Sequence, residues 1–245
     1  MTKKPRFTGL NKFLLEFLSI FIGVFAAFAL DNWNEDRKDH ITEMSILQEI
    51  NNGLKQDLLD IQVNTKGHEY GIIAIQHFRN LVLNIPVNND SITFHYFNLF
   101  RDFVSVQNNS GYETLKSKGL EIISNDSLRS KIIALYEGDY NTIRKLEEEY
   151  DELQFQENYY KDFNIKMSPY YQLDSLGTLK GVLSPVNLST PDKNQILSDF
   201  WKMQNNRVFI IQYYLEVEKR IKALQTEINK ELHLTLGNAN SCSAP

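Results

Sequence analysis

Histidines are the residues in this chain best suited to bind a metal or to transfer a proton. There are five of them: His40, His68, His77, His95 and His233. None has an acidic residue three positions earlier, so the Glu-x-x-His element of di-iron helical bundles is absent. No His-Glu-x-x-His zinc motif occurs, and the single cysteine, Cys242, excludes a cysteine-rich zinc site. We interpret the histidines as structural and expect no metal centre.

The densest group of carboxylates is the run EEEYDE at residues 147–152. A calcium or magnesium site needs oxygen ligands that converge on one point, whereas consecutive residues of a helix point outward in different directions. We therefore interpret this run as a solvated helix face. Glycine-rich phosphate motifs and the Gly-x-Ser-x-Gly elbow of hydrolases are also absent from the sequence. We expect no enzymatic activity and no cofactor.

Aromatic residues gather at four places, which are residues 94–97, 159–160, 170–171 and 213–214. Most of these side chains are expected to pack in the core. The remainder could line a groove for a peptide, a lipid or a small ligand. The preferred candidates for such a binding loop are Tyr170 and Tyr171, because they lie in a long segment without a helical pattern.

The formal charge of −5 is unevenly distributed along the 245 residues. The first thirty residues are net positive, so the rest of the chain is strongly acidic. An acidic body lacks the clustered Lys and Arg that bind a phosphate backbone, and we expect no nucleic-acid partner. A single cysteine forms no internal disulfide, and Cys242 is interpreted as an incidental thiol.

Residues 13–30 form a long apolar stretch in which Glu16 is the only charged residue. As a helix, these residues would span about 27 Å, close to the ~30 Å hydrocarbon thickness of a bilayer. The segment lacks the polar stripe that a core helix of a soluble protein normally carries. The sequence therefore predicts a transmembrane helix. Its apolar residues are Phe13, Leu14, Leu15, Phe17, Leu18, Ile20, Phe21, Ile22, Gly23, Val24, Phe25, Ala26, Ala27, Phe28, Ala29 and Leu30.

Three residues are expected at the membrane interfaces. Glu16 follows Lys12 by one helical turn, so the two side chains can pair and reach the headgroup layer. Trp33 lies at the other edge, where interfacial indole side chains are common. Glu16 is tolerable at such a boundary. The alternative is a functional carboxylate inside the membrane.

Two interpretations of this N-terminal region compete. The basic leader at residues 1–12 and the Ala-Phe-Ala pattern at residues 27–29 are typical of a cleaved signal peptide. An apolar stretch longer than the usual ~7–15 residues, followed directly by a helical pattern, favours an uncleaved anchor. The Lys and Arg residues of the leader then place the N-terminus in the cytoplasm and the body in the periplasm. We expect a single-pass protein of the cytoplasmic (inner) membrane.

Beyond the anchor, apolar residues recur at steps of three and four, which is typical of amphipathic helices. The expected fold is all-α: the transmembrane helix at residues 13–30 continues into an elongated antiparallel helical bundle, residues 31–236. The bundle has three long and two short helices, and a flexible tail at residues 237–245 follows it. Gly53, Gly67 and Gly71 predict a kink or break near residues 64–71.

Local signals divide the body further. Ser110 and Glu113 have the spacing of a capping box, and Gly119 is placed as a left-handed C-cap. Asn125 or Asp126 can cap a second long helix, whose apolar stripe reaches Tyr160. The Thr-Pro-Asp sequence at residues 190–192, with Thr190 as the cap, predicts the start of the last helix, whose apolar stripe includes Val208 and Leu215. Residues 166–190 hold two prolines and two glycines without a helical period, which is typical of functional or mobile loops. If the first long helix leaves the membrane, the second returns and the third points away. The loop at residues 166–190 is then expected near the membrane surface.

Two stretches resemble a known group of sequences. EFLSIFIGVFAAFALDNWNEDRK, residues 16–38, resembles the anchor of an uncharacterised family, a domain of unknown function, of small single-span membrane proteins from Bacteroidota-type bacteria. GYETLKSKGLEIISNDSLRSKIIALYE, residues 111–137, is similar to a second recurring segment of that family. The resemblance implies a retained anchor and no catalytic residues. The residues of the second segment singled out here are Gly111, Tyr112, Glu113, Leu115, Gly119 and Leu128.

The leading hypothesis is a membrane-anchored interaction or scaffold protein. It would present helix faces to a protein partner or to copies of itself. The alternative is a sensory or ligand-binding helical module. Only about twelve residues precede the span, so such a module would act through a partner in the membrane.

Overall fold

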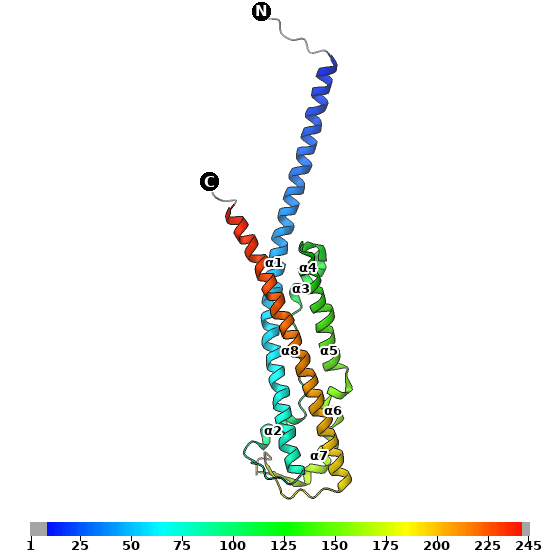
Figure 1. The fold of residues 1–245 in the computed structure, drawn as a ribbon, viewed down its shortest axis with the longest axis vertical. Helices are drawn as coiled ribbons and strands as arrows, with labels where there is room; N and C mark the ends of the chain where they lie inside the picture. The colour runs from blue at the N-terminus through cyan, green and yellow to red at the C-terminus, as the bar shows by residue number, and fades with distance from the viewer. Residues whose placement is uncertain (1–8, 242–245) are drawn as a thin grey trace, which may run out of the picture.

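The computed structural model describes residues 9–241, with side chains for residues 13–233. The fold is all-α, as the sequence predicts. Two long helices, α1 (Gly9–Val82) and α8 (Thr190–Ser241), run antiparallel, and shorter helices pack beside them to form a rod (Figure 1). The N-terminal part of α1 extends well beyond this rod. α8 continues to Ser241, past Gly237, where the sequence predicts its end.

The buried side of α1 follows a regular heptad-like spacing. Residues separated by alternating steps of four and three stay on one side of a helix. The buried residues at these steps are Glu43, Leu47, Ile50, Leu54, Asp57, Ile61, Asn64, His68, Gly71, Ile75, Phe78 and Val82. Because this spacing is unbroken from residue 43 to residue 82, one continuous helix joins the apolar segment to the far end of the body.

α8 buries a matching row of side chains, which differs from the prediction near its middle. Its members are Ile196, Phe200, Met203, Arg207, Ile210, Tyr214, Val217, Ile221, Leu224 and Ile228. Hydropathy alone predicts Val208 and Leu215 in the core, but these side chains are 40% and 44% exposed. The prediction was wrong for these two residues, because the regular spacing places the preceding residues, Arg207 and Tyr214, in the core instead.

The kink predicted near residues 64–71 does not occur, since α1 is helical from residue 9 to residue 82. The glycines serve close packing instead. A Cβ atom on Gly67 would lie 2.2 Å from the ring of Phe103, and one on Gly71 would lie 2.4 Å from the guanidinium carbon of Arg207. The missing side chains therefore make room for neighbouring segments.

Residues 100–109 form an extended return segment that runs back along α1, after the short helix α2 (Ile92–Leu99). Its position is fixed by carboxylates of α1. Asp60 accepts a hydrogen bond from the amide of Val106 at 2.8 Å, and Asp57 accepts one from the amide of Asn108 at 2.7 Å. The helix α3 (Ser110–Lys118) follows beside the part of the packed α1 that is nearer the apolar segment.

The third column of the rod is a series of short helices rather than the single long helix predicted for about residues 126–160. These elements are η1 (Leu120–Ile122), α4 (Asp126–Ile133), the π-helical η2 (Ala134–Tyr140), α5 (Asn141–Glu148), η3 (Asp151–Leu153), α6 (Phe155–Asn158), α7 (Tyr160–Met167) and η4 (Ser168–Tyr170). The column runs antiparallel to α8, as the pairs Lys131–Glu227 and Lys166–Asp192 indicate. It breaks at residues 149–154, where the amide of Phe155 donates to Asp102 of the return segment at 2.8 Å.

The predicted loop at residues 166–190 contains a small antiparallel hairpin, β1 (Tyr171–Leu173) and β2 (Leu179–Val182). It lies beside α2 and α7, at the end of the rod opposite the apolar segment (Figure 1). The expectation that this loop lies near the membrane surface was therefore wrong. The extended return segment already brings the chain back along α1, so the third column runs toward the far end.

Candidate functional site

An aromatic pocket lies at the end of the rod farthest from the apolar segment. Its volume of about 500 Å³ falls within the range of roughly 300–1,000 Å³ that is usual for small-molecule sites. α2, α7 and the hairpin each contribute to its wall. The side chains that define it are Thr93, Tyr96, Phe97, Tyr160, Asn164 and Tyr171.

Short contacts between these elements hold the pocket together. Thr93 of α2 donates its hydroxyl to the carbonyl of Leu179 in the hairpin at 2.7 Å. The hydroxyl oxygens of Tyr96 and Tyr160 are 2.9 Å apart, which ties α2 to α7. The ring of Tyr171 meets that of Tyr96 edge-on, with ring centres 5.8 Å apart. Three segments that are distant in sequence thus form one aromatic wall.

The pocket is electrically neutral. No Lys, Arg, Asp or Glu is among the described residues that line it. The hairpin carries two charged residues, Asp174 and Lys180, and they pair with each other at 3.4 Å. Burial raises the pKa of Tyr171, and it also raises the pKa of Tyr96. Both hydroxyls therefore stay protonated at neutral pH.

Several polar groups of the pocket retain unused hydrogen-bonding capacity. The hydroxyl of Tyr171 is shielded from water and has no partner among the described residues. The side-chain amide of Asn164 makes no hydrogen bond to any described residue, and neither does the hydroxyl of Thr178. Of the three, only the Tyr171 hydroxyl is shielded, since Asn164 is half-buried and Thr178 is exposed. A shielded polar group without a partner is unfavourable, so a ligand that reaches this hydroxyl would gain a hydrogen bond.

The structure separates the two residues of the predicted binding loop. Tyr171 lines the pocket, whereas Tyr170 donates its hydroxyl to the carbonyl of Asn187 at 2.7 Å. A binding role for either residue stays a prediction. Tyr96, Phe97 and Tyr160 belong to the aromatic groups noted in the sequence, but their convergence on Tyr171 could not be read from it. That convergence depends on the packing of α2 against α7 and the hairpin.

A buried arginine lies in the middle of the body. The side chain of Arg207 is fully buried, and its guanidinium donates to the carbonyls of Leu99 and Arg101 at 2.9 and 3.1 Å. These carbonyls lie at the C-terminal end of α2, which the cation stabilises. A further bond of 3.1 Å joins Arg207 to Nδ1 of His68, whose pKa is lowered to about 3 by burial and by the nearby positive charge. His68 is therefore neutral and accepts the bond, and this cluster joins α1, α2 and α8.

Two buried carboxyl groups hold the return segment. Glu147 accepts hydrogen bonds from the amide and hydroxyl of Ser105 and from the hydroxyl of Tyr214. Burial raises the pKa of Glu147 to about 7, although these hydrogen bonds oppose the shift. Asp57 is similar, with its pKa raised by burial to about 6. The interpretation of residues 147–152 as a solvated face was wrong for Glu147, because its side chain points into the core.

The histidines are distributed over several environments. His40 lies 3.4 Å from Glu43, and the rings of His77 and His95 stack with their centres 4.2 Å apart. Within the described residues, no three His, Cys, Asp or Glu side chains come together as metal ligands would. His68 lies in the arginine cluster, and the side chain of His233 is near the end of α8.

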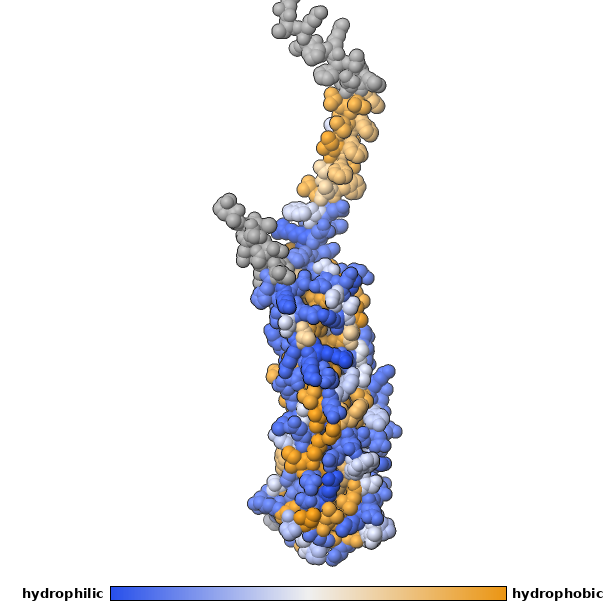
Figure 2. Space-filling model, in the orientation of Figure 1, coloured by the Kyte–Doolittle hydropathy of each residue, from blue (hydrophilic) through white to orange (hydrophobic). Residues whose placement is uncertain are grey.

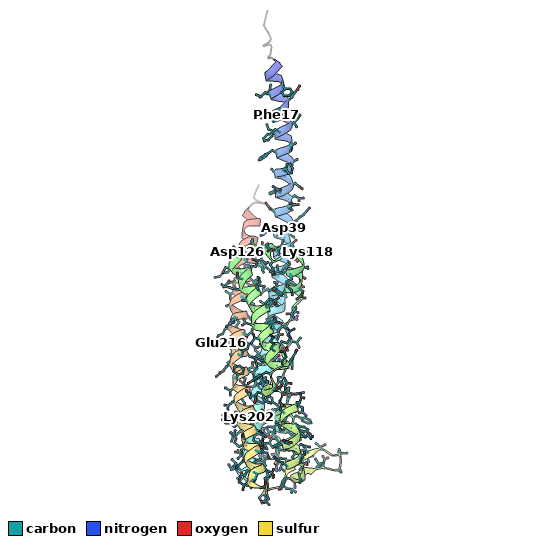
Figure 3. The ribbon with its side chains drawn as sticks, turned by 90° about the vertical axis from the view of Figure 1, so that its right-hand side faces the viewer. Phe17, Asp39, Lys118, Asp126, Lys202 and Glu216 are labelled. Carbon is teal, nitrogen blue, oxygen red and sulfur yellow. The ribbon has the colours of Figure 1, made fainter. Side chains whose placement is uncertain are left out.

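The predicted transmembrane residues lie outside the packed body. Within the described part of the chain, one helix contains a stretch long and apolar enough to cross a membrane, and none of that stretch is buried. Phe17 projects from α1 far from the other helices (Figure 3). Glu16 and Trp33 are likewise exposed, and the side chain of Lys12 lies outside the described residues. A role in membrane insertion stays a prediction for all of them.

The second family-like segment packs against the part of α1 that is nearer the apolar segment. Gly111 lies where a Cβ atom would come within 2.8 Å of the backbone of Ile50. The ring of Tyr112 stacks on that of Tyr136, with centres 4.5 Å apart. The buried members are Gly111, Tyr112, Leu115 and Leu128.

The capping signals of that segment had mixed outcomes. Gly119 directly follows α3 and has a positive φ of 102°, as predicted, but its ψ of 132° lies outside the left-handed helical region, so the left-handed cap itself does not form. The predicted capping box was wrong, because Ser110 bonds to Asn108 and Glu113 pairs with Lys116.

Comparison with known proteins identifies a family without an assigned activity. The model of the "Family of unknown function (DUF6090)" matches residues 16–168. Both stretches noted in the sequence, residues 16–38 and 111–137, fall inside this match, whereas the hairpin and α8 lie beyond it. No curated protein and no solved structure matches the chain. Because the match covers well over half of the sequence, the protein belongs to this family of unknown function.

Proposed function

We propose that this protein is a membrane-anchored helical interaction protein without enzymatic activity. It crosses the cytoplasmic membrane once, with its N-terminus in the cytoplasm and its body in the periplasm. The observation that carries this proposal is the continuity of α1. One helix passes from a fully exposed apolar segment into the packed body.

The apolar segment needs a nonaqueous environment. Its phenylalanines are largely exposed, with Phe13 at 73% and Phe25 at 68%. Figure 2 shows a hydrophobic shaft that rises from a mostly hydrophilic body. A contiguous apolar surface of this kind marks contact with a membrane or a partner, and its length suits a bilayer. From Leu30 to Val82, α1 would carry the aromatic pocket roughly 80 Å from the membrane edge.

Extraction and labelling test the anchor and its orientation. We expect the full chain, beginning at Met1, to stay in membranes during alkaline carbonate washing. In a Cys242→Ser background, a membrane-impermeant maleimide should label Ser175→Cys in intact spheroplasts. It should label Thr8→Cys in the leader only after permeabilisation. Release by carbonate, or a mature chain that begins near Asp31, would contradict the anchor, and the reverse labelling pattern would contradict the orientation.

An exposed apolar row on α8 supports a role in protein interaction. Trp201, Val208 and Leu215 are seven residues apart and are 64%, 40% and 44% exposed. Such a row suits contact with another helix, from a partner protein or from a second copy. Hydrophobic side chains interrupt the polar surface along the rod in the view of Figure 2.

Crosslinking in membranes tests this surface. We expect a stoichiometric crosslinked species with the wild-type chain, and its mass distinguishes a second copy from a different protein. The double variant Val208→Glu, Leu215→Glu should lose this species, whereas Lys202→Glu on the neighbouring exposed face should retain it. A wild-type chain that stays uncrosslinked, or a double variant that crosslinks normally, would contradict the proposed surface.

The aromatic pocket supports a second candidate function, that of a ligand-binding module which acts through a partner in the membrane. The observation that supports this function is the Tyr171 hydroxyl, which is shielded from water in a neutral aromatic wall and has no partner among the described residues. Binding there would alter how α2 and α7 pack on each other, because pocket residues join these two helices, and α2 in turn packs against α1.

A further inference from the structure

We infer that the aromatic pocket binds an uncharged carbohydrate, such as a short segment of a neutral glycan. The inference rests on the second candidate function, ligand binding, and is independent of the membrane anchor. Three properties of the pocket lead to it: its aromatic surface, its neutral polar groups and the absence of charge among its lining residues.

The aromatic surface suits the face of a sugar ring. Phe97 is 65% exposed at the rim, and Tyr96, Tyr160 and Tyr171 continue the wall inward. The π-face of an aromatic ring carries partial negative charge. One face of a pyranose presents several C–H groups with partial positive charge, so the two surfaces attract each other.

The polar groups suit hydroxyls. Tyrosine and threonine hydroxyls and the asparagine amide can each donate and accept hydrogen bonds, as sugar hydroxyls do. Tyr171 has a shielded hydroxyl without a partner among the described residues, while the half-buried Asn164 and the exposed Thr178 offer side-chain groups that bond to no described residue and are open to water. A purely apolar lipid chain would leave the Tyr171 hydroxyl without a partner and would displace water from Asn164, which is unfavourable.

The absence of charge argues against ionic ligands. A phosphate, a carboxylate or an ammonium group would lose water on entering the pocket without gaining a countercharge. A polyproline segment is the closest competitor, because aromatic grooves also bind such peptides. Proline residues offer acceptors but no N–H donors, so they would satisfy only half of the hydrogen-bonding capacity found here.

Saturation-transfer NMR on the full chain tests the inference. The protein is held in a detergent without a sugar headgroup, and the probes are chitotriose, cellotriose, maltotriose and decaproline. We expect saturable binding of at least one trisaccharide, with the strongest transfer to C–H protons of one ring face. Phe97→Ala should weaken binding about 3- to 10-fold, the loss expected for one aromatic stacking contact. Asn164→Ala should also weaken binding, and the double variant Phe97→Ala, Asn164→Ala should bind more weakly than either single variant.

A matched control lies on the same helix. Phe94→Ala removes an exposed aromatic side chain of α2 that contacts Tyr70 rather than the pocket, and it should leave binding unchanged. The thermal midpoint of each variant establishes that the body is folded. If none of the three trisaccharides binds, or if Phe97→Ala and Asn164→Ala both bind normally, the inference is wrong. If decaproline alone binds at these residues, ligand binding stands and the carbohydrate assignment falls.

Discussion

Gly71 lies on α1 directly against the buried side chain of Arg207. A Cβ atom there would be 2.4 Å from the guanidinium carbon, which has no room to move in the filled core. We expect Gly71→Ala to lower the free energy of unfolding by about 1–3 kcal/mol, the usual cost of overpacking. Urea denaturation measures this change.

Gly138 offers the matched control for that substitution. No atom lies within 4 Å of a Cβ built on it, and its helical φ is negative. Gly138→Ala should leave stability unchanged or raise it by up to about 1 kcal/mol, because alanine favours helix. Equal effects of the two substitutions would contradict the packing role of Gly71.

Glu147 couples the stability of the body to pH. Burial raises its pKa to about 7, above the ordinary value of 4.5. The native state therefore keeps a proton that the unfolded chain releases as the pH rises from about 4.5 to 7. The contribution of this group to stability is present below that range and is lost as the pH rises through 7.

We expect the wild type to lose about 2 kcal/mol of unfolding free energy, relative to Glu147→Gln, between pH 5 and pH 8. Urea titrations across this range measure the difference. Glu148→Gln, at the exposed neighbouring position, should follow the wild-type curve. Parallel curves for the wild type and Glu147→Gln would show that Glu147 ionises as an ordinary carboxylate.

At the scale of elements, the return segment is the unusual feature of the fold. It belongs to no helix or sheet, so side chains satisfy its backbone amides: Asp60 binds Val106, Asp57 binds Asn108 and Glu147 binds Ser105. A buried amide without a partner is unfavourable, and a carboxylate is a strong acceptor. The acidic residues of α1 and α5 therefore take the role that a neighbouring strand would have in a sheet.

Hydrogen exchange tests this role. Asp60→Ala removes the acceptor of the Val106 amide, and we expect exchange within residues 102–110 to become about tenfold faster, which corresponds to one hydrogen bond of about 1.4 kcal/mol. Glu49→Ala, at an exposed position of the same helix, should leave the exchange rate of that peptide unchanged. Protection that survives Asp60→Ala would mean that packing alone holds the segment.

At the scale of the whole molecule, the apolar segment belongs to α1 but does not pack against the body. None of the apolar stretch is buried against the rest of the protein. A chain that lacks residues 1–30 should therefore be water-soluble and should unfold within about 2 °C of the full chain in detergent, since no core contact is lost. Circular dichroism during heating measures both midpoints.

A longer truncation is the comparison. Removal of residues 1–50 also deletes Leu47 and Ile50, which are fully buried, and it should lower the midpoint markedly. Aggregation or unfolding of the shorter truncation would show that the apolar segment supports the body.

The sequence by itself determined the all-α class, the start of α8 and the position of the apolar segment, because these features depend on local composition and periodicity. α8 begins at Thr190, within one residue of the predicted start, although Ser189 rather than Thr190 accepts the capping bond from the amide of Asp192. Of the two candidate caps of α4, Asn125 and Asp126, the side chain of Asn125 accepts from the amide of Leu128. Every aromatic residue of the pocket also belongs to one of the aromatic groups that are evident in the sequence.

Only the tertiary structure decided the path of the chain and the environment of its polar core residues. Arg207, Glu147 and Asp57 look like surface residues in a hydropathy pattern, since their burial is stabilised by partners more than forty residues away. The same holds for the return segment, whose contacts with α1 carry no local signal. Hydrogen bonds between distant segments offset part of the cost of burying those groups, and these bonds exist only once the helices have packed.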